Sequence, residues 1–160
     1  MTHRIGVALA LAALVSLPVA ASEKTDVMGV LRRFNDSLNK GDRQATLAAC
    51  SELTSALDDI PPHEWHGAGA CTKWLDDLEA SNKTLQVTGL HDELGKPRHI
   101  NITGDRAYVV VPLDETYKMK GKQVVTSGNL WTVALQKGAS GWQMTAWAFS
   151  DGIEKTSDAK

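Results

Sequence analysis

A change in the period of the apolar residues constrains the fold of this chain more than any other feature. From Thr84 onward apolar and polar residues alternate, as in half-buried strands, whereas the segment before Thr84 has the wider spacing of helices. Gly104-Asp105, Gly121 and the residues 138–141 separate the apolar runs as hairpin turns. The predicted strands cover residues 85–90, 98–103, 106–118, 123–136 and 142–150.

Three helices are predicted ahead of these strands. Thr25 or Asp26 caps the first helix, which ends at Gly41, because glycine readily adopts the left-handed conformation of helix ends. The other predicted segments are a short helix over 42–49, a loop over 51–69 whose double proline forbids a helix, and a third helix over 70–80. Helices followed by sequential hairpins predict an α+β domain, with the helices packed on one face of a long, twisted sheet.

The first residues have the three-part pattern of a secretory signal peptide. Arg4 supplies a positive charge, and residues 5–17 form an apolar run that is too short to span a bilayer comfortably. Pro18 then breaks the helix, and the small residues that follow suit signal peptidase. We expect a signal peptide over 1–21 that is cut after Ala21, with an uncleaved membrane anchor as the alternative. The mature protein would be periplasmic or secreted, without membrane contact.

The rest of the chain has the length of one domain, predicted over 22–153 and followed by a flexible tail over 154–160. Its charge is nearly balanced, with 17 basic and 19 acidic residues in the whole sequence and a formal net charge of -2. No basic stripe is present, so nucleic acid is not an expected partner.

Two cysteines, Cys50 and Cys71, remain after the predicted cleavage. In an oxidising compartment an even, minimal pair favours one disulfide bond. Two alternatives stay open: a pair of buried free thiols, or a nucleophilic thiol near His63 or His66.

Three segments resemble a known superfamily. Residues 30–34 (VLRRF) with 38–42 (LNKGD) resemble the opening of nuclear-transport-factor-2-like domains, and residues 141–147 (GWQMTAW) resemble their last strand. Residues 58–71 (DDIPPHEWHGAGAC) resemble a bacterial SnoaL-like subgroup. The resemblance implies a cone-shaped α+β barrel, in which three N-terminal helices pack on a strongly curved antiparallel sheet. It also implies a homodimer that associates through the outer face of the sheet.

The ketosteroid isomerases of this superfamily use a carboxylate base and two hydrogen-bond donors that stabilise an enolate. The resemblance carries the base position onto Asp58, with Asp59 adjacent. The donor positions fall on Phe34, which has no proton to donate, and on Asn129. Because loss of one donor lowers rates by roughly 10²–10³, the resemblance implies at most a slower proton transfer, of isomerase or dehydratase type, with His63 or Asn129 as electrophile. The alternative for both aspartates is a solvated turn before the prolines.

The strand predicted over 123–136 offers a ligand pocket. A two-residue period places Ser127, Asn129 and Trp131 on one face. If this face is concave, an aromatic pocket with an amide and one or two carboxylates suits a small, mostly apolar ligand. The alternative is that the tryptophans simply fill the domain. The candidate pocket residues are Phe34, Trp65, His66, Asn129, Trp131 and Trp147.

Three functions remain open at this point. The leading hypothesis is an exported domain with a cavity for a small apolar molecule; the others are the proton-transfer enzyme and a structural or dimerisation module without ligand. His63 and His66 beside the two aspartates form only a weak metal motif, because no third ligand is evident and such histidines more often cap helices or bind backbone. We therefore expect neither a metal nor a cofactor.

Overall fold

The computed structural model describes residues 17–157, so most of the predicted signal peptide lies outside the described residues. Helix α1 (Leu17–Asn39) runs through the predicted cleavage site. The prediction that Thr25 or Asp26 caps this helix is wrong, because both lie inside it. Pro18 lies in the first turn, where a missing N–H is tolerated, and the alanines after it favour helix. None of the described helices is long and apolar enough to cross a membrane.

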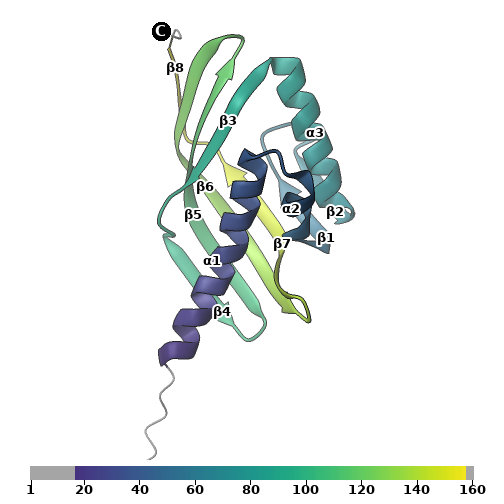
Figure 1. The fold of residues 1–160 in the computed structure, drawn as a ribbon, viewed down its shortest axis with the longest axis vertical. Helices are drawn as coiled ribbons and strands as arrows, with labels where there is room; N and C mark the ends of the chain where they lie inside the picture. The colour runs from purple at the N-terminus through teal and green to yellow at the C-terminus, as the bar shows by residue number, and fades with distance from the viewer. Residues whose placement is uncertain (1–16, 158–160) are drawn as a thin grey trace, which may run out of the picture.

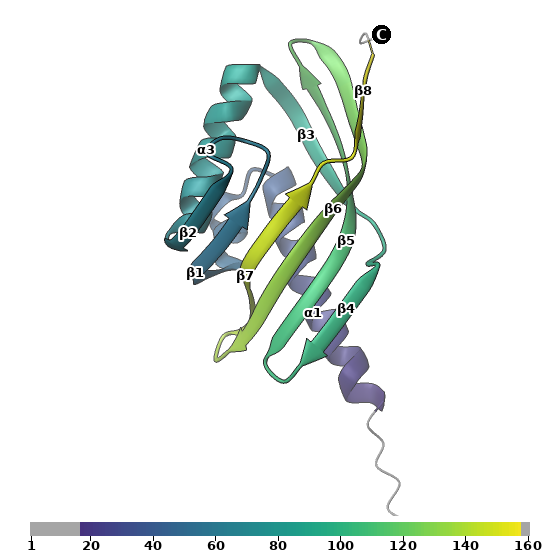
Figure 2. The same cartoon turned by 180° about the vertical axis from the view of Figure 1, so that it is seen from behind.

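Eight strands form one sheet, and α1 lies across one of its faces (Figures 1 and 2). They are β1 (Cys50–Leu57), β2 (Glu64–Ala68), β3 (Val87–Leu94), β4 (His99–Thr103), β5 (Arg106–Met119), β6 (Lys122–Gly138), β7 (Gly141–Ser150) and β8 (Ile153–Ser157). The order is β2-β1-β7-β6-β5-β3, with β4 paired to β5 and β8 paired to β6. The pair of β1 with β7 is parallel and the other pairs are antiparallel. The predicted α+β class with N-terminal helices on a curved sheet is confirmed.

Two segments differ from the sequence prediction. The stretch predicted as a loop between α2 (Arg43–Ala48) and α3 (Ala70–Leu85) is the hairpin of β1 and β2, with Pro61 and Pro62 in its turn. Pairing of β1 with β7, which is distant in sequence, supplies hydrogen bonds that a local pattern does not reveal. The tail prediction is wrong where the chain forms β8, an exposed strand that pairs with β6.

A bulge in β6 marks the bend of the sheet. Ser127 and Gly128 together lie opposite Asp114 of β5, and the N–H of Gly128 donates to Asp114 Oδ1 at 3.1 Å. The extra residue shifts the alternation of side chains along β6. Val124 is therefore fully buried on the inner side together with Asn129, whereas Ser127 is exposed. The prediction that Ser127 shares a face with Asn129 is wrong for this reason.

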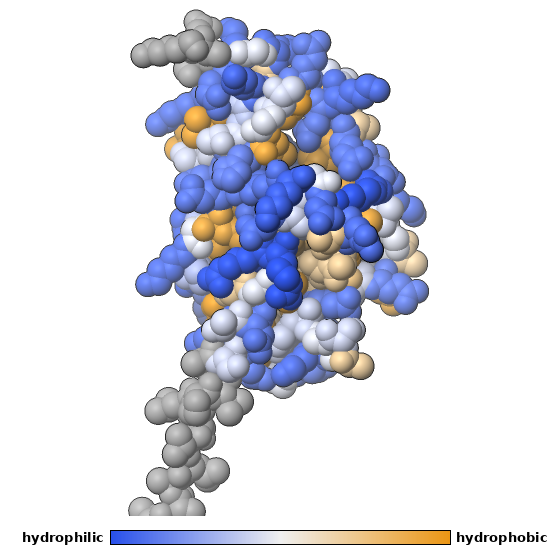
Figure 3. All heavy atoms as spheres, viewed as in Figure 1, coloured by the Kyte–Doolittle hydropathy of each residue, from blue (hydrophilic) through white to orange (hydrophobic). Residues whose placement is uncertain are grey.

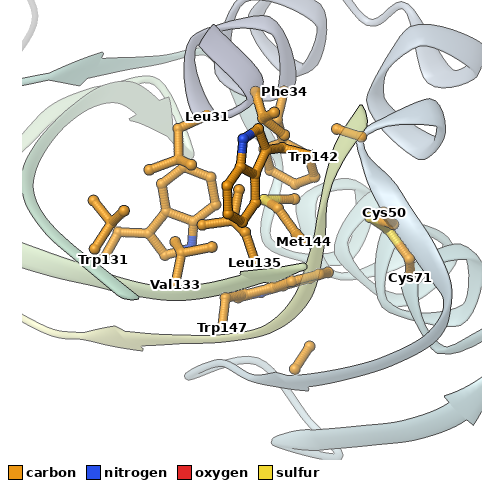
Figure 4. Packing of buried hydrophobic residues seen from close by; sticks show 14 of the residues in the cluster. Leu31, Phe34, Cys50, Cys71, Trp131, Val133, Leu135, Trp142, Met144 and Trp147 are labelled. Atoms are coloured by element: carbon orange, nitrogen blue, oxygen red, sulfur yellow. A yellow bond between two sulfur atoms is a disulfide. The ribbon is translucent and has the colours of Figure 1, made fainter. Parts of the chain in front are cut away.

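Aromatic side chains fill the space between α1, α3 and the sheet. Phe34 lies 5.3 Å from Trp131 and 5.7 Å from Trp74 between ring centroids, and Trp147 contacts Trp74 edge-on at 5.4 Å. Figure 4 shows Trp131 and its neighbours on β6 directed towards α1. On the face seen in Figure 3, hydrophilic residues cover most of the surface and hydrophobic residues gather only in small areas. The core thus accounts for most of the large apolar side chains.

A disulfide bond joins Cys50, at the start of β1, to Cys71 in the first turn of α3. Both cysteines are buried, and the described residues include no free cysteine. The predicted disulfide is confirmed. It fixes the β1–β2 hairpin, which carries Asp58, against α3.

Removal of this disulfide should lower the free energy of unfolding by about 3 kcal/mol, because a cross-link over 21 residues of sequence restricts the unfolded chain. Urea unfolding of the oxidised protein, the reduced protein and a Cys50→Ala/Cys71→Ala variant measures the effect. The reduced wild type controls for the lost thiol volume. Equal urea midpoints for the oxidised and reduced protein would contradict this expectation.

Candidate functional site

The candidate site is a cavity of about 80 Å³ at the bend of the sheet, between its inner face, α1 and α3. Its walls combine apolar and acidic side chains. The lining residues are Leu38, Asp58, Asp59, Trp74, Leu78, Leu90, Asp92, Leu113, Glu115, Asn129, Phe149, Ser150 and Asp151. A larger groove of about 470 Å³ between α1, α2 and the β6–β7 turn is more open to solvent, and the ionisable residues that line it are exposed or half-buried. The smaller cavity differs in that a buried carboxyl group, that of Asp92, borders it.

Three neighbouring strands place a row of polar side chains on the cavity wall. Asp92 of β3 lies directly opposite Glu115 of β5, and Glu115 lies opposite Thr126 of β6. Glu115 Oε2 accepts hydrogen bonds from Thr126 Oγ1 at 2.8 Å and from Asn129 Nδ2 at 3.3 Å. Asn129 Oδ1 in turn accepts from the N–H of Gly152 at 2.6 Å. Directly opposed carboxyl groups repel each other when both are charged, so this row is electrostatically strained at high pH.

Two asparagines of α1 hold the backbone of Asp92. Asn35 Nδ2 and Asn39 Nδ2 donate to the carbonyl oxygen of Asp92 at 2.9 and 2.8 Å, and the N–H of Asp92 donates to Asn39 Oδ1 at 2.8 Å. These three hydrogen bonds do not involve the side chain of Asp92. Asp92 is 6% exposed, and its Oδ1 has no hydrogen-bond partner among the described residues. Because such an orphaned buried oxygen is unfavourable, it marks the place where a donor is missing.

Burial raises the pKa of Asp92 from 3.8 to about 7, and the charge of Glu115 adds to the effect. Burial also raises the pKa of Glu115, against the opposing hydrogen bond from Thr126. Both carboxyl groups therefore keep their protons to higher pH than in an unfolded chain.

Asp58 follows β1 and reaches the cavity from the side of α3. Its Oδ2 accepts a hydrogen bond from Trp74 Nε1 at 2.5 Å, and its Oδ1 accepts one from the N–H of Asp59 at 2.7 Å. Burial, together with the neighbouring carboxyl of Asp59, raises the pKa of Asp58 to about 7 against the opposing hydrogen bond from Trp74. A carboxyl group with this pKa can give or take a proton near neutral pH.

The other predicted catalytic residues are less well placed. Asp59 lines the cavity but is exposed. His63 is exposed in the β1–β2 hairpin, where its Nδ1 lies 3.3 Å from the carbonyl oxygen of Asp58. His66 is also exposed, and it contacts Glu64 and Ser55. Neither histidine lines the cavity, so neither can exchange a proton with a molecule inside it.

Of the predicted pocket residues, Asn129 lines the cavity. Phe34, Trp131 and Trp147 are at most 3% exposed and pack against one another in the core. Trp65 is buried on β2 and donates its indole N–H to Asp77 at 2.7 Å. These positions match the alternative interpretation, in which the aromatic side chains fill the domain.

Sequence reasoning missed Asp92 and Glu115. Glu115 had a usable signal, because it continues the two-residue period of the buried Val111 and Leu113 on β5. Asp92 had no such signal, because the predicted strand ends at Leu90 and no pattern in the sequence indicates partners on α1. Among residues 17–157, no group of three or more metal-ligating side chains is arranged to hold a metal ion.

No protein-family model and no curated protein sequence matches this chain. Several solved structures match its fold. Hexachlorocyclohexane dehydrochlorinase LinA-type3 from Novosphingobium barchaimii LL02 has a TM-score of 0.75 at 4% identity, over 88% of this chain and 94% of that chain. A ketosteroid isomerase-like protein from Erwinia carotovora atroseptica SCRI1043 has a TM-score of 0.64 at 16% identity, over 81% and 95%. The nuclear-transport-factor-2-like fold that the sequence resemblance implied is therefore confirmed, and at these identities the likeness concerns the fold alone.

The raised pKa of Asp92 predicts a specific pH dependence of stability. A carboxyl group that titrates at about 7 when folded and at 3.8 when unfolded stabilises the protein at low pH, and this contribution is lost as pH rises from about 4 to 7. Asp92→Asn cannot ionise, so its free energy of unfolding relative to wild type should rise between pH 4 and pH 8. The rise should be about 4 kcal/mol at most, since one pKa unit corresponds to about 1.4 kcal/mol.

Urea unfolding at pH 4 and pH 8 measures this difference. Asp36→Asn, at an exposed position of α1 outside the cavity, is the matched control. The same wild-type-to-variant difference at both pH values would show that Asp92 does not hold its proton in the folded protein.

Proposed function

We propose that the protein is an exported small-molecule-binding domain, and that its ligand occupies the cavity at the bend of the sheet. The observation that carries this proposal is the unpartnered oxygen of Asp92, which is buried in the wall of this cavity. Buried polar atoms are nearly always hydrogen-bonded in folded proteins. A ligand with a hydrogen-bond donor would satisfy this one.

The size of the cavity limits the ligand. Pockets for drug-sized molecules hold roughly 300–1,000 Å³, whereas this cavity holds about 80 Å³. Phe34, Trp74, Trp131 and Trp147 pack against one another in the interior and fill much of the space between the helices and the sheet. The proposed ligand is therefore a compact molecule, or the compact end of a longer one.

Export is supported by two features. The first is the signal-like pattern at the N-terminus, and the second is the disulfide bond between Cys50 and Cys71, a bond typical of oxidising compartments. Cleavage after Ala21 would leave α1 to begin near Ser22, well before Val27, which is fully buried and is the first buried residue from Ser22 onward. The buried residues of α1 from Val27 onward would thus all remain in the mature chain.

A second candidate function is favoured by Asp58. Its carboxyl group lines the cavity, has a pKa of about 7 and is oriented by the indole of Trp74. These properties suit a general base or acid in an isomerase- or dehydratase-type proton transfer. The histidines lie outside the cavity, and Asn129 Nδ2 already donates to Glu115 and Thr126, so a protonated Asp92 would serve as the hydrogen-bond donor in such an enzyme.

Native mass spectrometry of protein purified from its exported form tests the first candidate. We expect a mature chain that begins at Ser22 and carries a small non-covalent ligand that denaturation releases. Leu113→Phe, which adds volume at a wall residue that is 2% exposed, should remove the ligand.

Leu53→Phe is the matched control, because Leu53 is 68% exposed and lies outside the cavity. Circular dichroism checks that both variants fold. Ligand retained equally by both folded variants would place the binding site elsewhere.

The second candidate predicts a titration of Asp58 that the indole of Trp74 reports. Loss of the negative charge weakens the hydrogen bond, so the Trp74 Nε1–H resonance should shift with a midpoint near pH 7, and Asp58→Asn should abolish the shift. The indole N–H of Trp131, which has no hydrogen-bond partner among the described residues, is the reference resonance. A midpoint close to the ordinary value of 3.8 would exclude Asp58 as a base that acts at neutral pH.

A further inference from the structure

The cavity of the proposed function has walls of one charge sign. Its ionisable lining residues are Asp58, Asp59, Asp92, Glu115 and Asp151, and no lysine, arginine or histidine of residues 17–157 lines it. No salt bridge within the described part of the chain reaches any of these five residues. Native proteins rarely bury acidic side chains without a paired cation. Of the five, Asp92 is buried, Asp58 and Glu115 are half-buried, and Asp59 and Asp151 are exposed, so the partner that this rule requires is a positive charge beside Asp92.

The hydrogen-bonding groups of the cavity wall also favour a positively charged ligand. Asp92 Oδ1 has no partner, whereas Asp58 and Glu115 already accept bonds from Trp74, Thr126 and Asn129. The walls thus have acceptor oxygens in excess of donors. A primary ammonium group offers three donors and no acceptor, while a hydroxyl group offers one donor and a carboxylate none.

From this complementarity we propose that the cavity binds a small primary alkylammonium ion, with its N–H groups directed at Asp92 Oδ1 and at the carboxylates of Glu115 and Asp58. This inference rests on the proposed ligand-binding function and names the class of its ligand. The apolar wall, formed by Leu38, Leu78, Leu90, Leu113 and Phe149, would contact the alkyl part. A volume of about 80 Å³ equals about three liquid waters of about 30 Å³ each, so it accommodates the ammonium group and the first carbons of the alkyl chain, while the rest of a longer chain extends out of the cavity.

Protons compete with the ammonium ion for the same oxygens. Asp58 and Asp92 each have a pKa of about 7, and that of Glu115 is raised as well, so the empty cavity holds protons at neutral pH. A bound cation favours the ionised carboxylates and displaces these protons. An alkylammonium ion keeps its charge throughout this range, as lysine does. Its affinity should therefore increase as pH rises from 6 to 8.

Other charged groups lie near Asp92 on its outer side. Arg32 and Asp36 of α1, with His91 and Glu93 of β3, line a separate groove of about 440 Å³ that Asp92 also borders. All four are exposed, and Arg32 forms no salt bridge with Asp92. Water screens their charges, so the acidic groups inside the cavity dominate the field at Asp92.

Titration of the isotope-labelled protein with n-butylammonium chloride, followed by amide NMR shifts at constant ionic strength, tests the proposal. Butan-1-ol and sodium butyrate have the same alkyl length and are the matched probes. At pH 8 we expect butylammonium to shift amides around Asp58, Asp92 and Glu115, with an affinity at least tenfold above that of butan-1-ol. Butyrate should cause no shift there, and the affinity for butylammonium should fall about tenfold at pH 6.

Asp92→Asn should weaken butylammonium binding at least tenfold while it leaves butan-1-ol binding within threefold, and Asp36→Asn should change neither. Equal affinities for butylammonium and butan-1-ol would overturn the ammonium assignment and leave the ligand cavity intact. Absence of binding by all three probes would overturn both the assignment and a cavity for small ligands. Tight butylammonium binding that survives Asp92→Asn would show that the ammonium group does not bind at Asp92.

Discussion

The bend of the sheet is the constraint on which the site depends. It occurs where β6 exchanges β7 for β8 as a partner, at the bulge of Ser127 and Gly128. Gly152 passes so close to this bulge that a Cβ atom there would lie 2.2 Å from the carbonyl oxygen of Ser127. Only glycine allows this approach, and its N–H then binds the side chain of Asn129. The same crossing thus curves the sheet and orients one wall of the cavity.

This geometry buries groups that oppose folding. Asp58, Asp92 and Glu115 share a small volume, and protonation is the way in which the empty protein avoids repulsion between them. The aromatic core and the disulfide supply stability elsewhere. A cluster that destabilises its own fold at neutral pH, yet is held by specific hydrogen bonds, is typical of a binding or catalytic site.

The sequence predicted the class of fold because its signals are local and periodic. The buried stripe of α1 and the two-residue alternation of β5 through β7 needed no knowledge of partners. The predictions for β1 and for the inner face of β6 near Ser127 were wrong. The parallel partner of β1 and the bulge in β6 are set by tertiary contacts, which a local pattern does not show. For the site, Asp58 and Asn129 were found through the family resemblance, whereas Asp92 became visible only with its contacts to α1.

Asp92 also shows why the cavity is more than a packing defect. Three hydrogen bonds join Asn35 and Asn39 to its backbone, two donated by the asparagines and one by the N–H of Asp92, while no group in the described part of the chain bonds to its buried Oδ1. A structural aspartate would be expected to satisfy its carboxyl group first, because that group is the harder one to bury. Here α1 fixes the strand, and the carboxyl group on the border of the cavity keeps an oxygen without a partner among the described residues. Since the same three bonds attach α1 to β3, the position of the helix and the aim of this oxygen cannot vary independently.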